Sequence, residues 1–88
     1  MDRRDFSEGE FVKHFKREFV SPGSMEYLYR IVAYAQHTDT GEKLVIYRAL
    51  YEPFTTYARP YDEFMSKVDK AKYPDVKQEY RFELYTGK

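Results

Sequence analysis

The block from Tyr34 to Met65 constrains the fold more than any other part of the sequence, YAQHTDTGEKLVIYRALYEPFTTYARPYDEFM. Apolar and polar residues alternate over 25–37 and again over 43–51, which predicts two strands joined by a turn at 38–42. Gly41 can supply the positive φ that such a turn requires. A short strand over 56–59 follows, and Pro60 then opens an amphipathic helix over 60–69. The block therefore predicts a small, mainly β fold.

The pairing of the two long strands follows from their apolar faces. Val45, Tyr47 and Ala49 share one face of the second strand, and the first strand has a matching face that includes Ala33 and Ala35. If these faces coincide, Ala33 lies opposite Tyr47 and Ala35 lies opposite Val45. A shift of one residue would turn the apolar set to the other face, so burial predicts this register.

The two ends of the chain are less regular. Residues 1–8 are mostly charged and are expected to form a flexible tail. Phe11, Phe15 and Phe19 recur at the spacing of a helix, but 11–16 also fits a strand, which we adopt because the family resemblance below supports it. Residues 78–85 alternate polar and aromatic side chains and predict a closing strand. The expected fold of 1–88 is a single domain, an SH3-like antiparallel β-barrel of about five strands with one short helix.

Composition narrows the class of protein. Ten Tyr and seven Phe supply the aromatic surface that an 88-residue chain needs for its core, since a domain this small buries only about 60% of its unfolded surface. Lys and Arg total 15 and Asp and Glu total 15, so the basic excess typical of nucleic-acid binders is missing. The sequence has no Cys, no signal-like N-terminus and no apolar run long enough for a membrane span. We therefore expect a cytoplasmic domain without membrane association.

Four strings of the sequence carry a family resemblance: HFK at 14–16, AQHTDTGEKLVIYRALY at 35–51, ARP at 58–60 and KYPDVKQEYRFE at 72–83. They resemble a bacterial family known as domain of unknown function 1653. The resemblance covers most of the chain and implies a compact, β-rich domain, but it implies no activity.

The sequence departs from that family at three places. Arg17 stands where the family has a glycine after HFK, so the tight turn expected there is in question. Residues 18–26 are additional, and they separate HFK from the strand that contains Tyr29. Glu63 stands where the family usually has Met before Phe64.

The two histidines are candidate ligand contacts. His37 ends the first long strand beside Thr38, where it can act as a general base or cap the turn through hydrogen bonds. The cap is the favoured interpretation. His14 shares a strand face with Lys16, and two histidines without a third ligand do not predict a metal site. We expect no metal and no cofactor.

Arg48 and Arg59 lie beside tyrosines within predicted strands, and arginine suits bidentate contacts with carboxylates or phosphates. Together with Lys16 and His14, they predict a pocket for an anion or an acidic peptide. The structural alternative pairs each arginine with a carboxylate nearby in the sequence, at 62 or 63 for Arg59 and at 42 or 52 for Arg48. This alternative is favoured.

Four tyrosines are candidate stacking surfaces, since aromatic rings can stack on the bases of single-stranded nucleic acid: Tyr47, Tyr51, Tyr57 and Tyr61. The alternative is that these tyrosines belong to the core. The sequence contains no nucleophile–base pair, no paired carboxylates in an apolar run and no phosphate-binding glycine loop. No catalytic residue is therefore predicted, and the protein is not expected to be an enzyme.

The favoured hypothesis is a non-catalytic module that binds a peptide or protein partner through a strand edge or an aromatic–arginine groove. Single-stranded nucleic-acid binding by a small β-barrel is the alternative, and a sensor of a small anion or metabolite is the third hypothesis. Weak self-association is also expected, because 78–85 offers exposed aromatic side chains on a strand that can lie at an edge.

Overall fold

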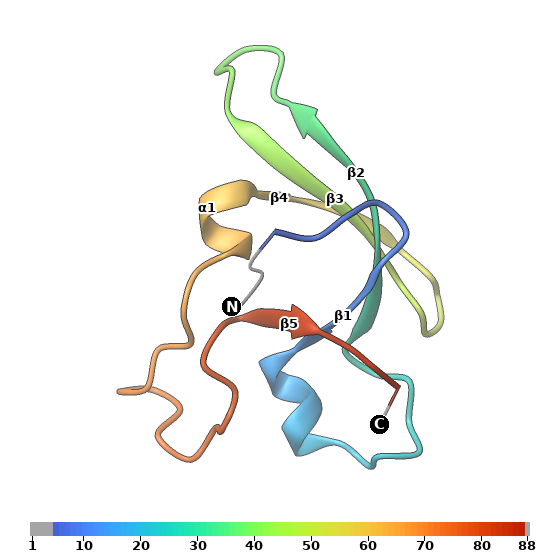
Figure 1. The fold of residues 1–88 in the computed structure, drawn as a ribbon, viewed down its shortest axis with the longest axis vertical. Helices are drawn as coiled ribbons and strands as arrows, with labels where there is room; N and C mark the ends of the chain where they lie inside the picture. The colour runs from blue at the N-terminus through green and yellow to red at the C-terminus, as the bar shows by residue number, and fades with distance from the viewer. Residues whose placement is uncertain (1–4, 88) are drawn as a thin grey trace.

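The computed structural model describes residues 5–87. Its elements in chain order are β1 (Phe11–His14), the 3₁₀ helix η1 (Phe15–Phe19), β2 (Leu28–Gln36), β3 (Lys43–Ala49), β4 (Thr56–Pro60), α1 (Tyr61–Phe64) and β5 (Phe82–Leu84). The five strands form one antiparallel sheet of order β4-β3-β2-β1-β5 (Figure 1). The prediction of a mainly β fold with five strands and one short helix is confirmed.

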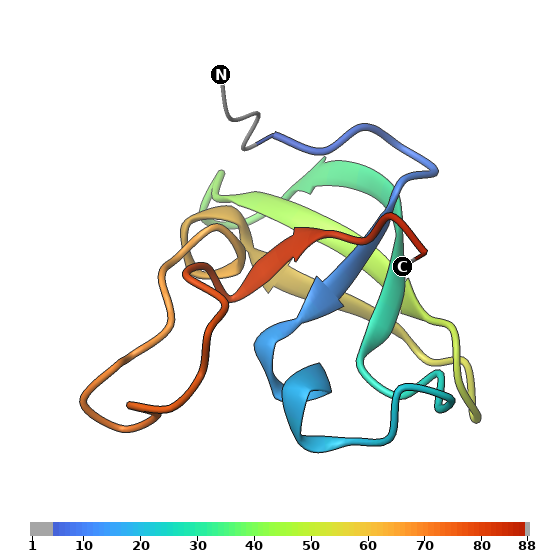
Figure 2. The same ribbon diagram turned by 60° about the horizontal axis from the view of Figure 1, so that its bottom comes forward.

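The sheet curves but does not close, so the predicted barrel is an open sheet with two edge strands (Figures 1 and 2). Within the sheet, β4 pairs only with β3, and β5 pairs only with β1. The predicted closing strand over 78–85 is shorter than expected, because only Phe82–Leu84 joins the sheet. Since β5 lies at an edge, weak self-association through this segment stays a prediction.

The hairpin of β2 and β3 extends beyond the other strands (Figure 1). Its predicted register is wrong by one residue, since Ala33 lies opposite Ile46 and Ala35 lies opposite Leu44. The reason is a bulge just before Ala33, which adds one residue to β2 and reverses the side chains that face inward. Beyond the bulge, Tyr34 packs against the core. The turn is as predicted, with Gly41 at a φ of 75°.

Residues 9–20 contain a strand followed by a short helix. β1 covers Phe11–His14, so the predicted strand is right at its start, but η1 replaces it from Phe15 onward. His14 caps η1, because its Nδ1 accepts a hydrogen bond from the backbone N–H of Lys16 at 3.1 Å. The three phenylalanines separate: Phe15 is buried, whereas Phe11 and Phe19 are exposed.

Arg17, which replaces the glycine expected after HFK, organises the connection that follows η1. Its guanidinium donates hydrogen bonds to the carbonyl oxygens of Pro22, Ser24 and Glu26, at 3.1, 2.6 and 3.0 Å. The additional residues 18–26 therefore wrap around a single side chain, and this clasp takes the place of a tight turn.

The helix predicted over 60–69 is wrong in length, since α1 covers only Tyr61–Phe64. The hydroxyl of Ser66 donates to the carbonyl oxygen of Glu63 at 2.6 Å just after its end. The chain then runs beside 79–81, where Val68 N–H donates to the Glu79 carbonyl at 2.9 Å and Arg81 N–H donates to the Ser66 carbonyl at 2.8 Å. Pairing with a segment distant in the sequence thus replaces the helix that the local pattern predicts.

The side of the sheet that α1 covers, which we call the inner face, holds the main core. Its buried residues are Phe6, Val12, Tyr29, Ile31, Val45, Tyr47, Ala49, Phe64 and Phe82. At its centre, the rings of Phe64 and Phe82 stack with their centroids 4.0 Å apart. Because Phe6 belongs to this core, the expected tail is packed at that point; residues 1–4 of the tail lie outside the described residues.

Residues 66–81, which we call the arm, connect α1 to β5 and project from the sheet on the side of η1 (Figure 2). A second, smaller apolar cluster joins η1 to the arm. It contains Phe15, Val68 and Val76, and Tyr73 packs against it. The arm is therefore held by its own small core.

Candidate functional site

A cavity of about 400 Å³ lies between the arm, η1 and the adjoining ends of β1 and β4. Its lining, which defines the basic pocket, consists of His14, Phe15, Lys16, Arg59, Asp69, Lys72, Tyr73 and Arg81. Four of these residues are Lys or Arg and one is an Asp, in a protein whose formal net charge is zero. Positive charge is therefore concentrated at this site.

The basic pocket lies where the sheet fails to close. Arg59 belongs to the edge strand β4, and its guanidinium carbon lies 5.9 Å from the ring centre of Phe82 in the other edge strand, β5. His14 is opposite Phe82 in the register of β1 and β5, and Arg81 directly precedes Phe82. The approach of the two edges thus gathers basic side chains from distant parts of the chain.

Arg59 is fixed by two partners. Its Nε donates to the Tyr47 hydroxyl at 3.1 Å, and its Nη1 donates to the Glu63 carboxylate at 2.7 Å. Burial opposes the charge of Arg59, but these two contacts outweigh burial and raise the pKa of Arg59. The expected pairing of Arg59 with a carboxylate of the helix is confirmed, and Arg59 lines the basic pocket as well.

His14 is about nine-tenths buried in the wall of the basic pocket. Burial, together with the positive charges of Arg81, Arg59 and Lys16, lowers the pKa of His14 to about 3. The imidazole is therefore neutral near pH 7. Because Nδ1 accepts the hydrogen bond from Lys16, the ring proton lies on Nε2.

The Nε2–H group of His14 has no hydrogen-bond partner among residues 5–87. Every fully buried side-chain nitrogen or oxygen in the described residues has a hydrogen-bond partner. Because Nε2 of His14 has none, this atom must reach solvent. The cavity beside His14 is the basic pocket. The ring is held by stacking on Phe15, with centroids 4.4 Å apart, and by the edge of Phe82 at 5.0 Å. The pocket thus combines a fixed neutral donor with four cations, a set that suits a carboxylate or a phosphate.

Lys72, Arg81 and Asp69 complete the basic pocket and were not predicted. Asp69 supports the local turn by accepting hydrogen bonds from the backbone N–H groups of Ala71 and Lys72, at 3.0 and 3.4 Å. Arg81 Nε donates to the Ser66 hydroxyl at 3.2 Å. Both Lys72 and Arg81 belong to the string 72–83 that resembles the family, and this is the signal in the sequence that could have identified them.

Arg48 does not join the basic pocket. It lies on the opposite face of the sheet, where its Nε donates to the Phe54 carbonyl at 3.0 Å. The expected pairing of Arg48 with the carboxylate at 42 or 52 is wrong, because neither contacts it within the described residues. The predicted four-residue pocket is therefore right for His14, Lys16 and Arg59 as neighbours and wrong for Arg48.

His37 and the candidate tyrosines also lie outside the lining of the basic pocket. His37 caps the hairpin turn, since its Nδ1 accepts hydrogen bonds from the backbone N–H groups of Asp39 and Thr40 at 3.1 and 3.3 Å. Tyr47 is buried in the core. Tyr57 packs beside it, with ring centroids 5.5 Å apart, and is 40% exposed. Tyr57 therefore offers the accessible ring of this pair.

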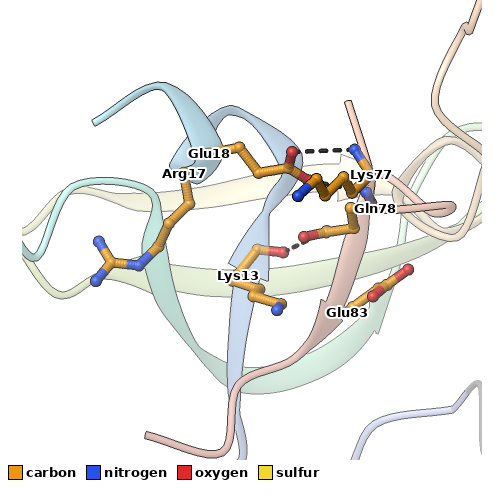
Figure 3. A pocket seen from close by; sticks show the side chains of 6 residues that line it. All are labelled: Lys13, Arg17, Glu18, Lys77, Gln78 and Glu83. Carbon is orange, nitrogen blue, oxygen red and sulfur yellow. Dashed lines mark hydrogen bonds between the residues drawn. The ribbon is translucent and has the colours of Figure 1, made fainter. Parts of the chain in front are cut away.

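A larger hollow, of about 610 Å³, has a structural role (Figure 3). It is lined by Lys13, Arg17, Glu18, Lys77, Gln78 and Glu83. The Glu18 carboxylate accepts hydrogen bonds from the backbone N–H groups of Lys77 and Gln78, at 3.0 and 2.8 Å, and Gln78 Nε2 donates to the Lys13 carbonyl at 3.0 Å. These contacts attach the arm to η1 and β1.

Residues 5–87 contain neither a cluster of metal ligands nor a helix that could span a membrane. No group of three or more His, Asp or Glu side chains in this range is placed to hold a metal ion. In the same range, no helix has the length and apolar character needed to cross a membrane.

A family model described as protein of unknown function (DUF1653) matches residues 10–84. The chain belongs to this family. The DUF1653 match includes every strand and helix from β1 to β5, and with them the whole lining of the basic pocket. The family resemblance noted in the sequence is confirmed. No curated protein and no solved structure gives a significant match to the chain.

Proposed function

We propose that this DUF1653 protein is a non-catalytic module that binds an acidic segment of a peptide or protein partner in the basic pocket. The observation that carries the proposal is the Nε2–H group of His14, which has no hydrogen-bond partner among residues 5–87 and adjoins a cavity lined by four cations. A carboxylate in this cavity would accept a hydrogen bond from His14 and charge-assisted hydrogen bonds from Lys16 and Lys72.

The free edge of β4 supports a peptide segment over an isolated small anion. Among residues 5–87, β4 pairs only with β3, so its other edge has backbone groups that no described strand pairs with. Arg59 reaches the basic pocket from this strand, and Tyr57 on the same strand is 40% exposed. An extended partner segment that pairs with this edge would carry its side chains past Tyr57 and towards the pocket.

Two properties support binding over the other functions considered. A general base works best when its pKa lies near the operating pH, and the pKa of His14, about 3, makes it a poor base near neutrality. A polyanion requires a continuous basic track, whereas the chain has zero net charge. The Cys-free composition is compatible with a cytoplasmic location, which we include in the proposal.

The proposal is tested by NMR titration of the isotopically labelled full chain with a capped peptide of alternating Glu and Val. We expect shifts at His14 Nε2 and along β4, and about tenfold weaker binding when Gln replaces Glu in the peptide. The double variant Lys16→Gln/Lys72→Gln should also weaken binding about tenfold. Lys77→Gln, a matched exposed lysine of the arm outside the pocket, should leave it unchanged.

Two additional ligands give the outcomes that overturn the proposal. A mixed-sequence single-stranded oligonucleotide, tested at about 50 and about 200 mM salt, would overturn it by binding more tightly than the peptide with steep salt dependence. Inorganic phosphate would overturn it by binding the same residues more tightly than the peptide, which would indicate a small-anion sensor. Equal binding of the Glu and Gln peptides would also contradict it.

A further inference from the structure

The side of the sheet opposite the core, which we call the outer face, carries a row of side chains from four strands. Phe11 of β1 lies opposite Arg30 of β2, Arg30 lies opposite Arg48 of β3, and Arg48 lies opposite Thr56 of β4. All four residues are exposed. The centre of the row therefore consists of two arginines directly opposite each other on adjacent strands.

Nothing in residues 5–87 neutralises these two arginines. The guanidinium of Arg30 makes no hydrogen bond or ion pair with the described residues, and the guanidinium of Arg48 uses only its Nε, which donates to the Phe54 carbonyl. Glu8 lines an adjoining hollow together with Arg30 but forms no ion pair with it. Like charges directly opposite each other destabilise a sheet. The pair therefore costs stability and leaves guanidinium donors available to a ligand.

Apolar side chains flank the arginine pair. A hollow of about 510 Å³ is lined by Arg30, Val32, Arg48, Ala49, Leu50, Phe54 and Thr56. Val32, at the bulge of β2, and Phe54 are 43% and 44% exposed. Phe54 has a φ of 60°, a conformation that bulky residues rarely adopt. Its ring centre lies 5.8 Å from the guanidinium carbon of Arg48. The hollow thus offers cationic and apolar contacts side by side.

We propose that Arg30 and Arg48 form a second binding site, which takes an acidic side chain of a partner protein that is flanked by apolar side chains. Each guanidinium can donate two parallel hydrogen bonds to a carboxylate, and the flanking side chains would cover Val32 and Phe54. Nucleic acid fits less well, because Arg30 and Arg48 are the only Lys or Arg side chains among the described residues that line these hollows, and a phosphate backbone requires a longer basic track. This site lies on the face opposite the core and does not depend on the basic pocket.

The test is an NMR titration of the full chain with a capped peptide, Gly-Leu-Glu-Leu-Gly, and its Gln analogue. We expect the Nε–H resonances of Arg30 and Arg48 to shift with the Glu peptide, and affinity to fall about fivefold or more in Arg30→Gln and in Arg48→Gln. Arg48→Lys keeps the charge but loses the planar fork, so it should restore affinity only in part. Lys16→Gln/Lys72→Gln in the basic pocket should leave these shifts unchanged.

Three results would overturn this proposal. The first is equal binding of the Glu and Gln peptides, since the carboxylate would then contribute nothing. The second is a set of shifts confined to His14 and Lys16, which would assign the peptide to the basic pocket alone. The third is a larger shift of the Arg30 and Arg48 resonances with single-stranded oligothymidine than with the Glu peptide. Because the two sites have separate reporter resonances and variants, failure here leaves the basic-pocket proposal to its own test.

Discussion

Arg59 and Arg30 belong to the same sheet, but they lie on opposite faces and have opposite surroundings. On the inner face, Arg59 donates to the Tyr47 hydroxyl and to the Glu63 carboxylate, so its charge is compensated before any ligand arrives. On the outer face, Arg30 lies opposite Arg48, and its guanidinium has no hydrogen-bond partner among residues 5–87. The charge of Arg59 therefore stabilises the fold, whereas the charge of Arg30, on the other face of the same sheet, can be compensated only by a ligand.

The aromatic side chains show the same division. Phe82 on the inner face stacks on Phe64 and meets the edges of Tyr29 and Tyr47. Phe54 on the outer side is 44% exposed and lies near one guanidinium. Removing the two rings should therefore have very different effects on stability.

The largest expected effect separates these two rings. Phe82→Ala removes a ring that is 1% exposed at the centre of the core, and we expect the free energy of unfolding to fall by about 3–5 kcal/mol. Phe54→Ala, the matched change on the outer side, should alter it by about 0.5 kcal/mol or less. Urea denaturation followed by circular dichroism measures both. Similar losses for the two variants would contradict the division between the faces.

The second-largest expected effect is a loss of stability at acidic pH, which depends on His14. The pKa of His14 is about 3 in the folded protein, because of burial and the nearby charges of Arg81, Arg59 and Lys16, and 6.5 in the reference state. As the pH falls below 6.5, the unfolded chain takes up a proton that the folded chain does not, so stability is lost between pH 6.5 and about 3. Between about pH 7.5 and pH 5, this loss amounts to about 2 kcal/mol.

His14→Gln should remove that part of the pH dependence while it keeps a side-chain acceptor for the N–H of Lys16. His37→Gln is the matched control, because His37 lies in the hairpin turn away from the core, and the part of the pH dependence that comes from His14 should persist in it. Urea midpoints measured across this pH range test both expectations. A wild-type slope that persists in His14→Gln would show that other groups cause it.

The smallest expected effect concerns the outer-face pair and has the opposite sign. Arg30→Thr removes one of two like charges that face each other and introduces a residue that favours strands, so the free energy of unfolding should rise by about 0.3 kcal/mol at low salt. High salt should reduce the gain, because screening already weakens the repulsion. Arg59→Gln on the inner face should instead lower stability. A loss in Arg30→Thr would indicate a stabilising contact that the described residues do not contain.

The strands of the central hairpin could be predicted from the sequence because apolar and polar residues alternate along each of them. Their register could not be predicted, since the bulge before Ala33 is an insertion into the pairing that alternation alone does not reveal. The helix over 60–69 fitted its local pattern, but 66–68 pairs with 79–81 instead, and no local pattern contains that information. Tertiary contacts therefore account for both errors.

The candidate site could be predicted only in part, for related reasons. His14 and Lys16 are close in sequence, and Arg59 reaches them because the edges of the sheet approach each other. Side chains alternate between the two faces of a strand, so Arg48, which directly follows Tyr47 in β3, lies on the other face. Predicting one pocket that contains both Arg48 and Arg59 therefore conflicted with the same alternation that predicted β3. Arg81 joins the site through the path of the arm, whereas the sequence placed it in a closing strand over 78–85.

The attachment of the arm through Glu18 has a consequence for the order in which the protein assembles during synthesis. The Glu18 carboxylate accepts hydrogen bonds from the backbone N–H groups of Lys77 and Gln78, which lie 59 and 60 positions later in the chain. A nascent chain leaves the ribosome N-terminus first, so β1 to β4 emerge before Lys77 and Gln78 do. Until the arm emerges, water solvates the Glu18 carboxylate. Phe82, which completes the core, is the next residue after the arm. The basic pocket consequently needs the chain as far as Arg81, so it forms after β1 to β4 have been synthesised.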